Sequence, residues 1–213
     1  LGAKGRVLPM ALTPMHITAE VRGLRDDPGV TTTVRGQVEV ATTEGTIVSI
    51  DLDPPDPPVS AEALTRIADA DWAFLGPGSW FSSVLPHLRV PALREAVIAT
   101  SARLVVVLNL EEQAGETGGF GPADHLRVLL EHVPDLQVHT VLTDPSSCDA
   151  AHLDELRGVV ESAGAALVLA DVAHDDGSPR HDPRKLASAY ARIMANGDRE
   201  GAVEPTRTAD GGC

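Results

Sequence analysis

The segment "RLVVVLN", Arg103–Asn109, decides the fold of this chain. Its apolar core, Leu104 to Leu108, shows no alternation of apolar and polar positions, which is typical of a central parallel strand covered on both faces. Parallel neighbours need long crossover connections, and these are usually helices. The sequence around this segment should therefore alternate between strands and helices.

That alternation is present on both sides of the segment. Further strands are predicted in "DWAFLG", "LQVHTVLTD" and "AALVLADV". Helices are predicted in "SAEALTRIADA", "VPALREAVIATS", "GPADHLRVLLEHV", "DAAHLDELRGVVESAG" and "DPRKLASAYARIMANG". Ser60 and Asp182 are suited to N-cap two of these helices, Pro122 to open a third, and Gly164 and Gly197 to end two. The pattern predicts an α/β fold with a mainly parallel sheet.

The first fifty residues are instead rich in β patterns. Ile17, Ala19 and Val21 alternate with polar residues, as in a half-buried strand. Two more runs, Val34–Ala41 and Thr46–Leu52, are separated by "TTEG", which predicts a hairpin. The prolines of "DPPDPPVS" then end regular structure. We expect an N-terminal β-rich hairpin region within one α/β domain over residues 1–196, and a disordered tail over 197–213, where no periodicity remains.

Composition limits the classes of function. The 213 residues carry a formal net charge of −14, which disfavours nucleic acid and anionic membranes as partners. No apolar run approaches the ~18 residues of a membrane span. The two cysteines, Cys148 and Cys213, fit a reducing cytosol. The start at Leu1, without Met or a signal-like segment, suggests a processed or fragmentary chain. We expect a cytoplasmic protein that neither binds nucleic acid nor inserts into membranes.

Three polar, glycine-containing loops should follow the carboxyl ends of strands, where open parallel sheets bind ligands. They are Gly76–Pro86, Asn109–Gly121 and Asp171–Pro183. In the first, Gly76 and Gly78 permit close backbone approach, and three serines with nearby N–H groups suit a phosphate. The serines are Ser79, Ser82 and Ser83. The alternative is a Pro-Gly turn with serine caps, which needs no ligand.

The other two loops supply further candidate contacts. The amide of Asn109 is suited to a base or a sugar hydroxyl, and Glu116 and Thr117 to ligand hydroxyls. The alternative for this loop is a mobile acidic surface segment. In the third loop Arg180 is the candidate phosphate contact, although "DGSP" is also a common turn. No catalytic residue and no metal ligand is assigned from these patterns.

Three segments carry a family resemblance: "GRVLPM" (Gly5–Met10), "ADWAFLGPGSWFSSVLPHLRVPAL" (Ala70–Leu93) and "LNLEEQAGETGGFGPADHL" (Leu108–Leu126). In order and spacing they resemble the YvcK/CofD-like family, whose bacterial members are called gluconeogenesis factors. The resemblance runs from Gly5 to about Asn196 and implies a Rossmann-like three-layer α/β sandwich in the cytoplasm. The YvcK branch is associated with UDP-activated amino sugars and cell shape. The CofD branch transfers a phospholactyl group from a nucleotide diphosphate donor, with magnesium.

The chain departs from the family pattern in two places. The family's N-terminal glycine-rich turn is absent, so the chain corresponds to roughly the C-terminal two-thirds of the family fold. The loop that commonly reads Gln-Pro-Gly-Glu-Thr-Asp-Gly is "QAGETGG" here, with Ala114 for the proline and Gly118 for the aspartate.

Three functions follow as hypotheses. The first is a regulatory protein that binds a nucleotide sugar such as UDP-N-acetylglucosamine, linked to carbon metabolism, gluconeogenic growth and cell shape. The second is a 2-phospho-L-lactate transferase that uses Mg²⁺, with Glu116, Asp171 and Asp175 as candidate carboxylates. The third is a non-binding fragment. The patterns favour the binder, and the resemblance implies a homo-oligomer.

Overall fold

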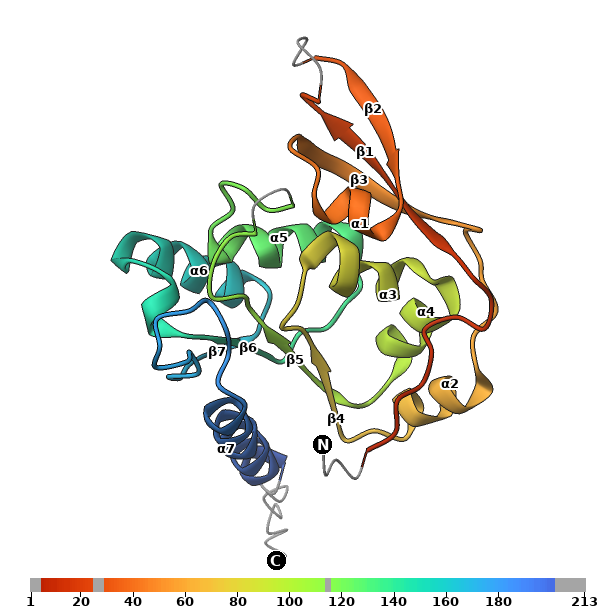
Figure 1. Ribbon diagram of the computed structural model, residues 1–213. Coiled ribbons are helices and arrows are strands. Elements are labelled where there is room, and N and C mark those ends of the chain that lie inside the picture. The colour runs from red at the N-terminus through yellow and green to blue at the C-terminus, as the bar shows by residue number, and fades with distance from the viewer. Residues whose placement is uncertain (1–4, 25–28, 114–115, 202–213) are drawn as a thin grey trace, which may run out of the picture. The chain divides into compact units, whose positions relative to one another are not determined.

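The computed structural model describes residues 5–24, 29–113 and 116–201 (Figure 1). The chain divides into two compact units, Leu1–Ala170 and Asp171–Cys213. The first unit holds both β-sheets and most of the helices, and the second holds a turn and one long helix. The α/β class with an antiparallel N-terminal region, predicted from the sequence, is confirmed.

The larger sheet is parallel and has the order β4-β5-β6-β7. Its strands are β4 (Trp72–Leu75), β5 (Arg103–Val107), β6 (Thr140–Thr143) and β7 (Ala166–Leu169). The interior strand β5 contains Val105, Val106 and Val107, each with 0% of its surface exposed. Burial of one such side chain contributes roughly 1.5–3 kcal/mol to folding. The prediction of a central buried strand is therefore confirmed.

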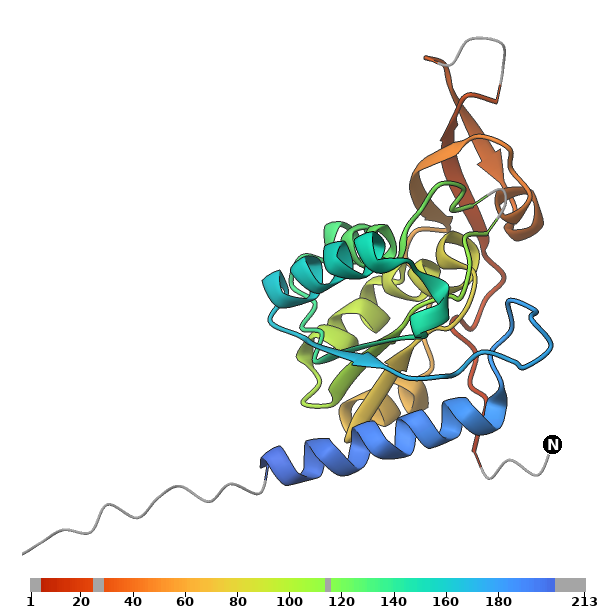
Figure 2. The ribbon, with the colours of Figure 1, turned by 90° about the vertical axis from the view of Figure 1, so that its left-hand side faces the viewer.

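Helices α4 (Pro91–Ala99), α5 (Pro122–His132) and α6 (Ala150–Ser162) form the crossovers between these strands. Since the strands are added in one direction with right-handed crossovers, these helices lie on one face of the sheet (Figure 2). Helix α2 (Ala61–Ala68) precedes β4. Its predicted N-cap is confirmed, because Ser60 Oγ accepts a hydrogen bond from the Ala63 N–H at 3.4 Å.

The smaller sheet is antiparallel and has the order β2-β1-β3. Its strands are β1 (His16–Arg22), β2 (Thr31–Arg35) and β3 (Thr46–Asp53). Ile17, Ala19 and Val21 are buried, as the alternation in the sequence predicted. The central strand is thus β1, and it pairs with both neighbours.

The predicted hairpin between Val34–Ala41 and Thr46–Leu52 is wrong. Strand β2 ends at Arg35, and Gly36 turns the backbone at φ 120° into the short helix α1 (Gln37–Ala41). In α1 only Val40 is buried, whereas Val38 is 70% exposed. The alternation of "QVEVA" fits a strand locally, but the strand that pairs with β3 in this sheet is β1, and β2 pairs with the other side of β1.

After β4 and the turn at residues 76–79, two short helical elements follow each other without a break: the π-helix η1 (Trp80–Val84) and α3 (Leu85–Arg89). A 3₁₀ turn, η2 (Pro145–Ser147), follows β6 and is capped by Asp144. The sequence did not separate these pieces. Among the described helices, none is both long enough and apolar enough to cross a bilayer.

The second unit contains helix α7 (Pro183–Gly201). Its predicted N-cap is confirmed, since Asp182 Oδ1 accepts from the N–H groups of Arg184 and Lys185 at 2.8 and 3.0 Å. The predicted helix end at Gly197 is wrong, because the helix continues to Gly201. A single glycine costs a helix about 1 kcal/mol and does not by itself end it. The rest of the predicted tail, 202–213, lies outside the described residues.

Candidate functional site

The first two polar loops follow neighbouring parallel strands, β4 and β5, and the structure joins them. Asn109 Oδ1 accepts a hydrogen bond from the Gly78 N–H at 3.1 Å, and Asn109 Nδ2 donates to the Gly78 oxygen at 2.9 Å. The two loops therefore form one wall at the carboxyl edge of the sheet, where the sequence placed a ligand site.

Gly76 and Gly78 of the first loop differ in what an added side chain would meet. Gly76 has a φ of 79°, and a Cβ there would lie 2.6 Å from the Val107 oxygen. The fold itself therefore requires glycine at this position. At Gly78 a Cβ would lie 3.8 Å from the nearest atoms, those of Ser83 and Val84, which is ordinary contact. Packing does not explain Gly78, so this glycine is the better candidate for close approach by a ligand.

Glu116 connects the second loop to the start of η1. The residue is 4% exposed, its Oε1 accepts from Ser79 Oγ at 2.5 Å, and its Oε2 accepts from the Phe81 N–H at 2.9 Å. Ser79 Oγ also lies 2.5 Å from Ser82 Oγ. A carboxylate at the first helical turn is favourable because it accepts hydrogen bonds that the helix leaves unmade. In this structure both Glu116 oxygens contact the other loop.

The remaining predicted residues are placed as follows. Thr117 is fully buried, and its Oγ1 accepts from the Gln113 N–H at 2.8 Å, which shapes the loop. The Ser83 oxygen accepts from His87 Nδ1 at 2.7 Å. All of the predicted contacts except Arg180 belong to the first unit.

Arg180 lies in the second unit, where it forms an ion pair with Asp176 at 3.1 Å. The hydroxyl and N–H of Ser178 also donate to Asp176, and these bonds lower the pKa of its carboxyl to about 2. In the same unit Lys185 Nζ bonds to Asp171 at 2.9 Å and Asp175 at 2.5 Å. Ion pairs within the second unit therefore hold the third loop, and two of them join it to Lys185 in the first turn of α7.

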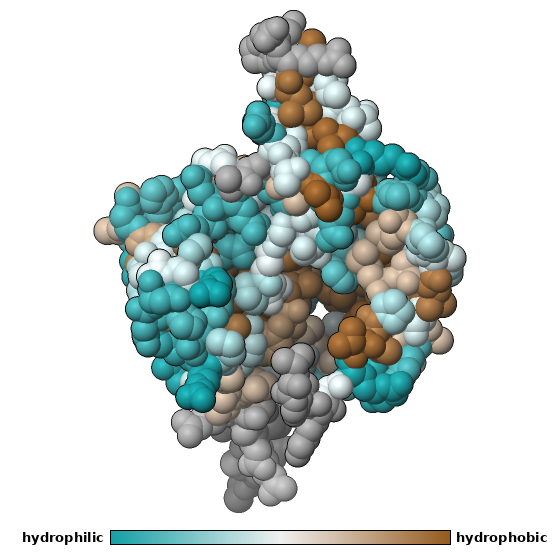
Figure 3. All heavy atoms as spheres, viewed as in Figure 1, coloured by the Kyte–Doolittle hydropathy of each residue, from teal (hydrophilic) through white to brown (hydrophobic). Residues whose placement is uncertain are grey.

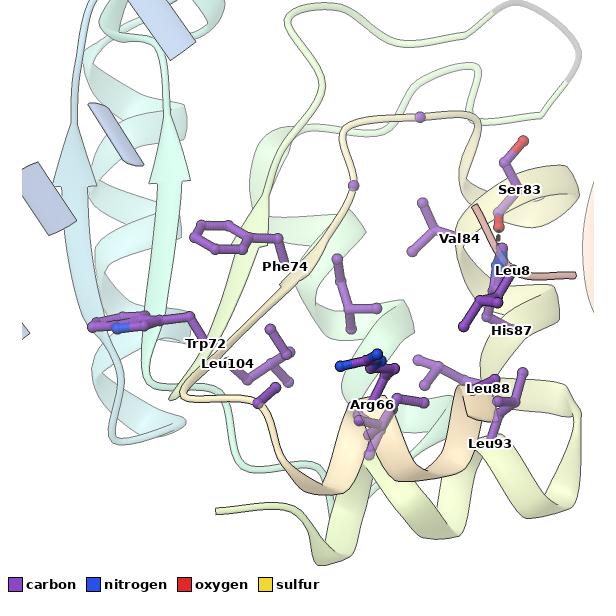
Figure 4. Close-up of a pocket in the computed structure, with 18 of the residues that line it drawn as sticks. Leu8, Arg66, Trp72, Phe74, Ser83, Val84, His87, Leu88, Leu93 and Leu104 are labelled. Carbon is purple, nitrogen blue, oxygen red and sulfur yellow. Dashed lines mark hydrogen bonds between the residues drawn. The ribbon is translucent and has the colours of Figure 1, made fainter. Parts of the chain in front are cut away.

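A cavity of about 580 Å³ borders the first loop on the side of β4 (Figure 4). Gly76, Gly78 and Ser83 belong to its wall, and most of the remaining lining is apolar. Among the described residues that line it, the ionisable ones are Arg66 and His87, and neither is acidic. Figure 4 shows Arg66 rising from α2 and the Ser83–His87 hydrogen bond on the α3 side. In a chain of net charge −14, this lining suits an anion.

A second cavity, of about 430 Å³, lies where the N-terminal segment and α1 meet η1 and α3. Ser83 and His87 line both cavities. The sequence patterns assigned no site role to His87, nor to Gln37, Met10 and Met15, which also line the second cavity. No local pattern marks these residues, because they come from separate elements.

Aromatic rings from η1, α5 and the second loop form a cluster beside the wall that the first two loops make. The rings of Trp80 and His125 meet edge to face at 5.3 Å between centroids, and Phe120 lies 5.6 Å from His125. Burial lowers the pKa of His125, opposed by its hydrogen bond to the Gly121 carbonyl and by the charge of Asp124. This packing links η1, α5 and the second loop.

Within the described ranges, no group of three or more His, Cys, Asp or Glu side chains is close enough to hold a metal ion. The groups that the two joined loops and the adjoining cavity present are backbone, amide, hydroxyl and basic groups.

A parallel α/β sheet with joined polar loops at the ends of two neighbouring strands places this protein in the Rossmann-like class. The chain belongs to the CofD family: the family described as 2-phospho-L-lactate transferase CofD matches residues 1–179. The family resemblance seen in the sequence is thus confirmed.

Within this family the chain is similar to gluconeogenesis factors. A Mycobacterium tuberculosis protein named "Putative gluconeogenesis factor" is 44% identical over 206 residues, covering 96% of this chain and 59% of that protein. The Listeria innocua "Gluconeogenesis factor" is 27% identical, covering 94% and 63%. A crystal structure of a UPF0052 family protein from Bacillus halodurans matches with a TM-score of 0.74 at 27% identity, covering 89% and 63%. The chain thus spans less than two thirds of these relatives.

Proposed function

We propose that this chain carries the ligand site of a cytoplasmic regulatory factor that binds a nucleoside diphosphate sugar such as UDP-N-acetylglucosamine. The observation that carries the proposal is the pair of hydrogen bonds between Asn109 and Gly78. It brings two polar loops together at the strand ends, where sheets of this class bind nucleotides. The role in carbon metabolism and cell shape belongs to the same proposal.

The charge distribution supports an anionic ligand. Gly78 leaves space for close approach, and its cavity has Arg66 and His87 as the ionisable groups of its described lining. Among the described residues, no acceptor is recorded for the Ser79 N–H, which follows Gly78 directly. A diphosphate against Gly78 and Ser79 would gain this donor and the guanidinium of Arg66.

The transferase alternative depends on carboxylates that could hold Mg²⁺. Both oxygens of Glu116 accept hydrogen bonds from the first loop, and Asp171 and Asp175 bind Lys185 in the second unit. Each of these groups would have to leave its present partner to contact a metal. A binding role uses the observed contacts without rearrangement, and for that reason we favour it.

Self-association is part of the proposal. Apolar side chains gather on the N-terminal sheet region, where Val30, Val38 and Val48 are 39%, 70% and 46% exposed (Figure 3). Strand β2 also forms an edge of that sheet. Exposed apolar patches beside sheet edges are typical of contacts between copies. Sedimentation velocity should show a concentration-dependent dimer or larger species, and a strictly monomeric chain would contradict this part.

The binding proposal is tested by calorimetric titration with UDP-N-acetylglucosamine and with GDP, each with and without Mg²⁺. We expect the UDP-sugar to bind without turnover. Gly78→Ala should weaken binding at least tenfold, because the added methyl group occupies the approach to the backbone. Gly158→Ala, in α6, is the matched control, since a Cβ there meets nothing within 4 Å. Absence of heat with both nucleotides, or equal affinity in Gly78→Ala, would overturn the proposal.

A further inference from the structure

The second cavity has polar side chains whose orientation is fixed by neighbouring backbone carbonyls. The Ser82 oxygen accepts from Gln37 Nε2 at 3.0 Å, and the Ser83 oxygen lies 2.7 Å from His87 Nδ1. A carbonyl oxygen can only accept, so His87 Nδ1 carries the hydrogen in this pair. Two consecutive residues thus orient one amide and one imidazole.

This arrangement leaves two acceptor atoms. The Gln37 amide donates through nitrogen, which leaves its Oε1, and the His87 ring donates through Nδ1, which leaves its Nε2. Both side chains are exposed, and among the described residues neither atom accepts a hydrogen bond, so water or a ligand can reach them. A ligand that satisfies them must bring hydrogen-bond donors of its own.

The rest of the lining indicates what kind of donor. Met10 and Met15 contribute flexible apolar side chains. The described lining contains neither Lys nor Arg, and its ionisable residues are His16 and His87. Acceptors beside thioethers fit a ring with hydroxyl groups on its edge and C–H groups on its face. A phosphate, which needs donors or positive charge, fits poorly here.

We propose that this cavity binds the hydroxyl-bearing ring of a sugar, with Gln37 and His87 as its hydrogen-bond acceptors. The inference rests on the proposed function in one respect: Ser83 and His87 line both cavities, so one nucleotide sugar can place its diphosphate at Gly78 and its ring beyond Ser83. The ring has two possible sources, the ribose of the nucleotide or the pendant sugar.

The three methionines of the chain give a direct test. With ¹³C-labelled methionine methyl groups, Met10 and Met15 report on the cavity, and Met194 in α7 is an internal reference in the second unit. Free N-acetylglucosamine should shift the Met10 and Met15 signals if the pendant sugar occupies the cavity. UDP should shift them if ribose does. The Met194 signal should stay in place.

Gln37→Leu removes one acceptor and should weaken the titrating sugar about fivefold or more, which corresponds to one hydrogen bond of about 1 kcal/mol. Val38→Ala is the matched control in α1, since Val38 is 70% exposed and lies outside the cavity lining. The wild-type titration decides the main point even if Gln37→Leu folds poorly.

The inference is overturned if neither N-acetylglucosamine nor UDP shifts Met10 or Met15, if Met194 shifts equally, or if folded Gln37→Leu binds as tightly as the wild type. Failure here is separable from failure of the proposed function. If calorimetry shows that UDP-N-acetylglucosamine binds but the Met10 and Met15 signals do not shift, only the proposal of a sugar site in the second cavity fails. If the free sugar shifts the methionine signals but no nucleotide binds, the proposed nucleotide function is contradicted and the sugar site in the second cavity is supported.

Discussion

The side-chain amide of Asn109 is bonded at both ends to the backbone of Gly78, its Oδ1 to the N–H at 3.1 Å and its Nδ2 to the oxygen at 2.9 Å. The two residues are 31 positions apart and belong to loops after neighbouring strands. The shape of the candidate site therefore depends on a contact between loops.

Asn109→Asp should destabilise the fold by about 1–3 kcal/mol, because the second carboxylate oxygen would face the Gly78 oxygen with no hydrogen to donate. The free energy of unfolding in urea measures this. Asn196→Asp is the matched control, since Asn196 is exposed on α7. Equal stability of Asn109→Asp and the wild type would show that the pair contributes nothing to the wall.

The stabilities of Gly76→Ala and Gly78→Ala should differ, because the fold requires glycine at position 76, whereas at position 78 we expect glycine to serve ligand binding. Gly76→Ala places a Cβ 2.6 Å from the Val107 oxygen at positive φ, so we expect a loss of about 1–3 kcal/mol. Gly78→Ala meets only ordinary contacts and should stay within about 0.5 kcal/mol. Thermal unfolding of the two variants compares them directly. A reversed order would mean that the backbone contacts assigned to these glycines are wrong.

Glu116→Ala should cost about 1–3 kcal/mol, because it leaves the Phe81 N–H and the Ser79 hydroxyl without their acceptor. Glu116→Gln keeps one oxygen for Phe81 and should lose less. The order of urea midpoints should be wild type, then Gln, then Ala. Glu111→Ala, on the exposed part of the same loop, should leave the midpoint unchanged. If Glu116→Ala behaves like this control, the carboxylate does not hold the loops together.

His125 should make stability depend on pH. Burial lowers its pKa in the folded state below the ordinary value near 6.5. The unfolded chain therefore binds a proton at a pH where the folded chain does not, and stability rises with pH. The contribution is fully present above about pH 6.5 and is lost as the pH falls towards the lowered pKa, by up to about 1.4 kcal/mol per pH unit.

His125→Asn should remove this part of the pH dependence while keeping an N–H donor for the Gly121 oxygen. Unfolding free energies at pH 7.5, 6.5 and 5.5 give the slope for each protein. His16→Asn, at an exposed position, should retain the wild-type slope. An unchanged slope in His125→Asn would assign the acid sensitivity to other groups.

The sequence predicted that Gly76, Asn109 and Glu116 lie in loops that follow strands, and the structure brings these loops together at the carboxyl edge of the sheet. The sequence did not assign their partners. Asn109 was expected to face a ligand, and its amide instead bonds to Gly78. Glu116 was expected to meet hydroxyls of a ligand, and it bonds to Ser79 and to Phe81, 35 residues away. Whether these groups also contact a ligand stays a prediction.

Local interactions explain what the sequence determined by itself. The apolar run of β5 specifies a strand buried on both faces, and Ser60 and Asp182 cap helices through atoms three residues or fewer away. Tertiary structure decided the rest. Residues 37–41 form a helix that buries Val40, while β3 pairs with β1, and Gly76 must be glycine because the Val107 oxygen lies against it. Contacts between distant segments determine these features, and no local pattern contains them.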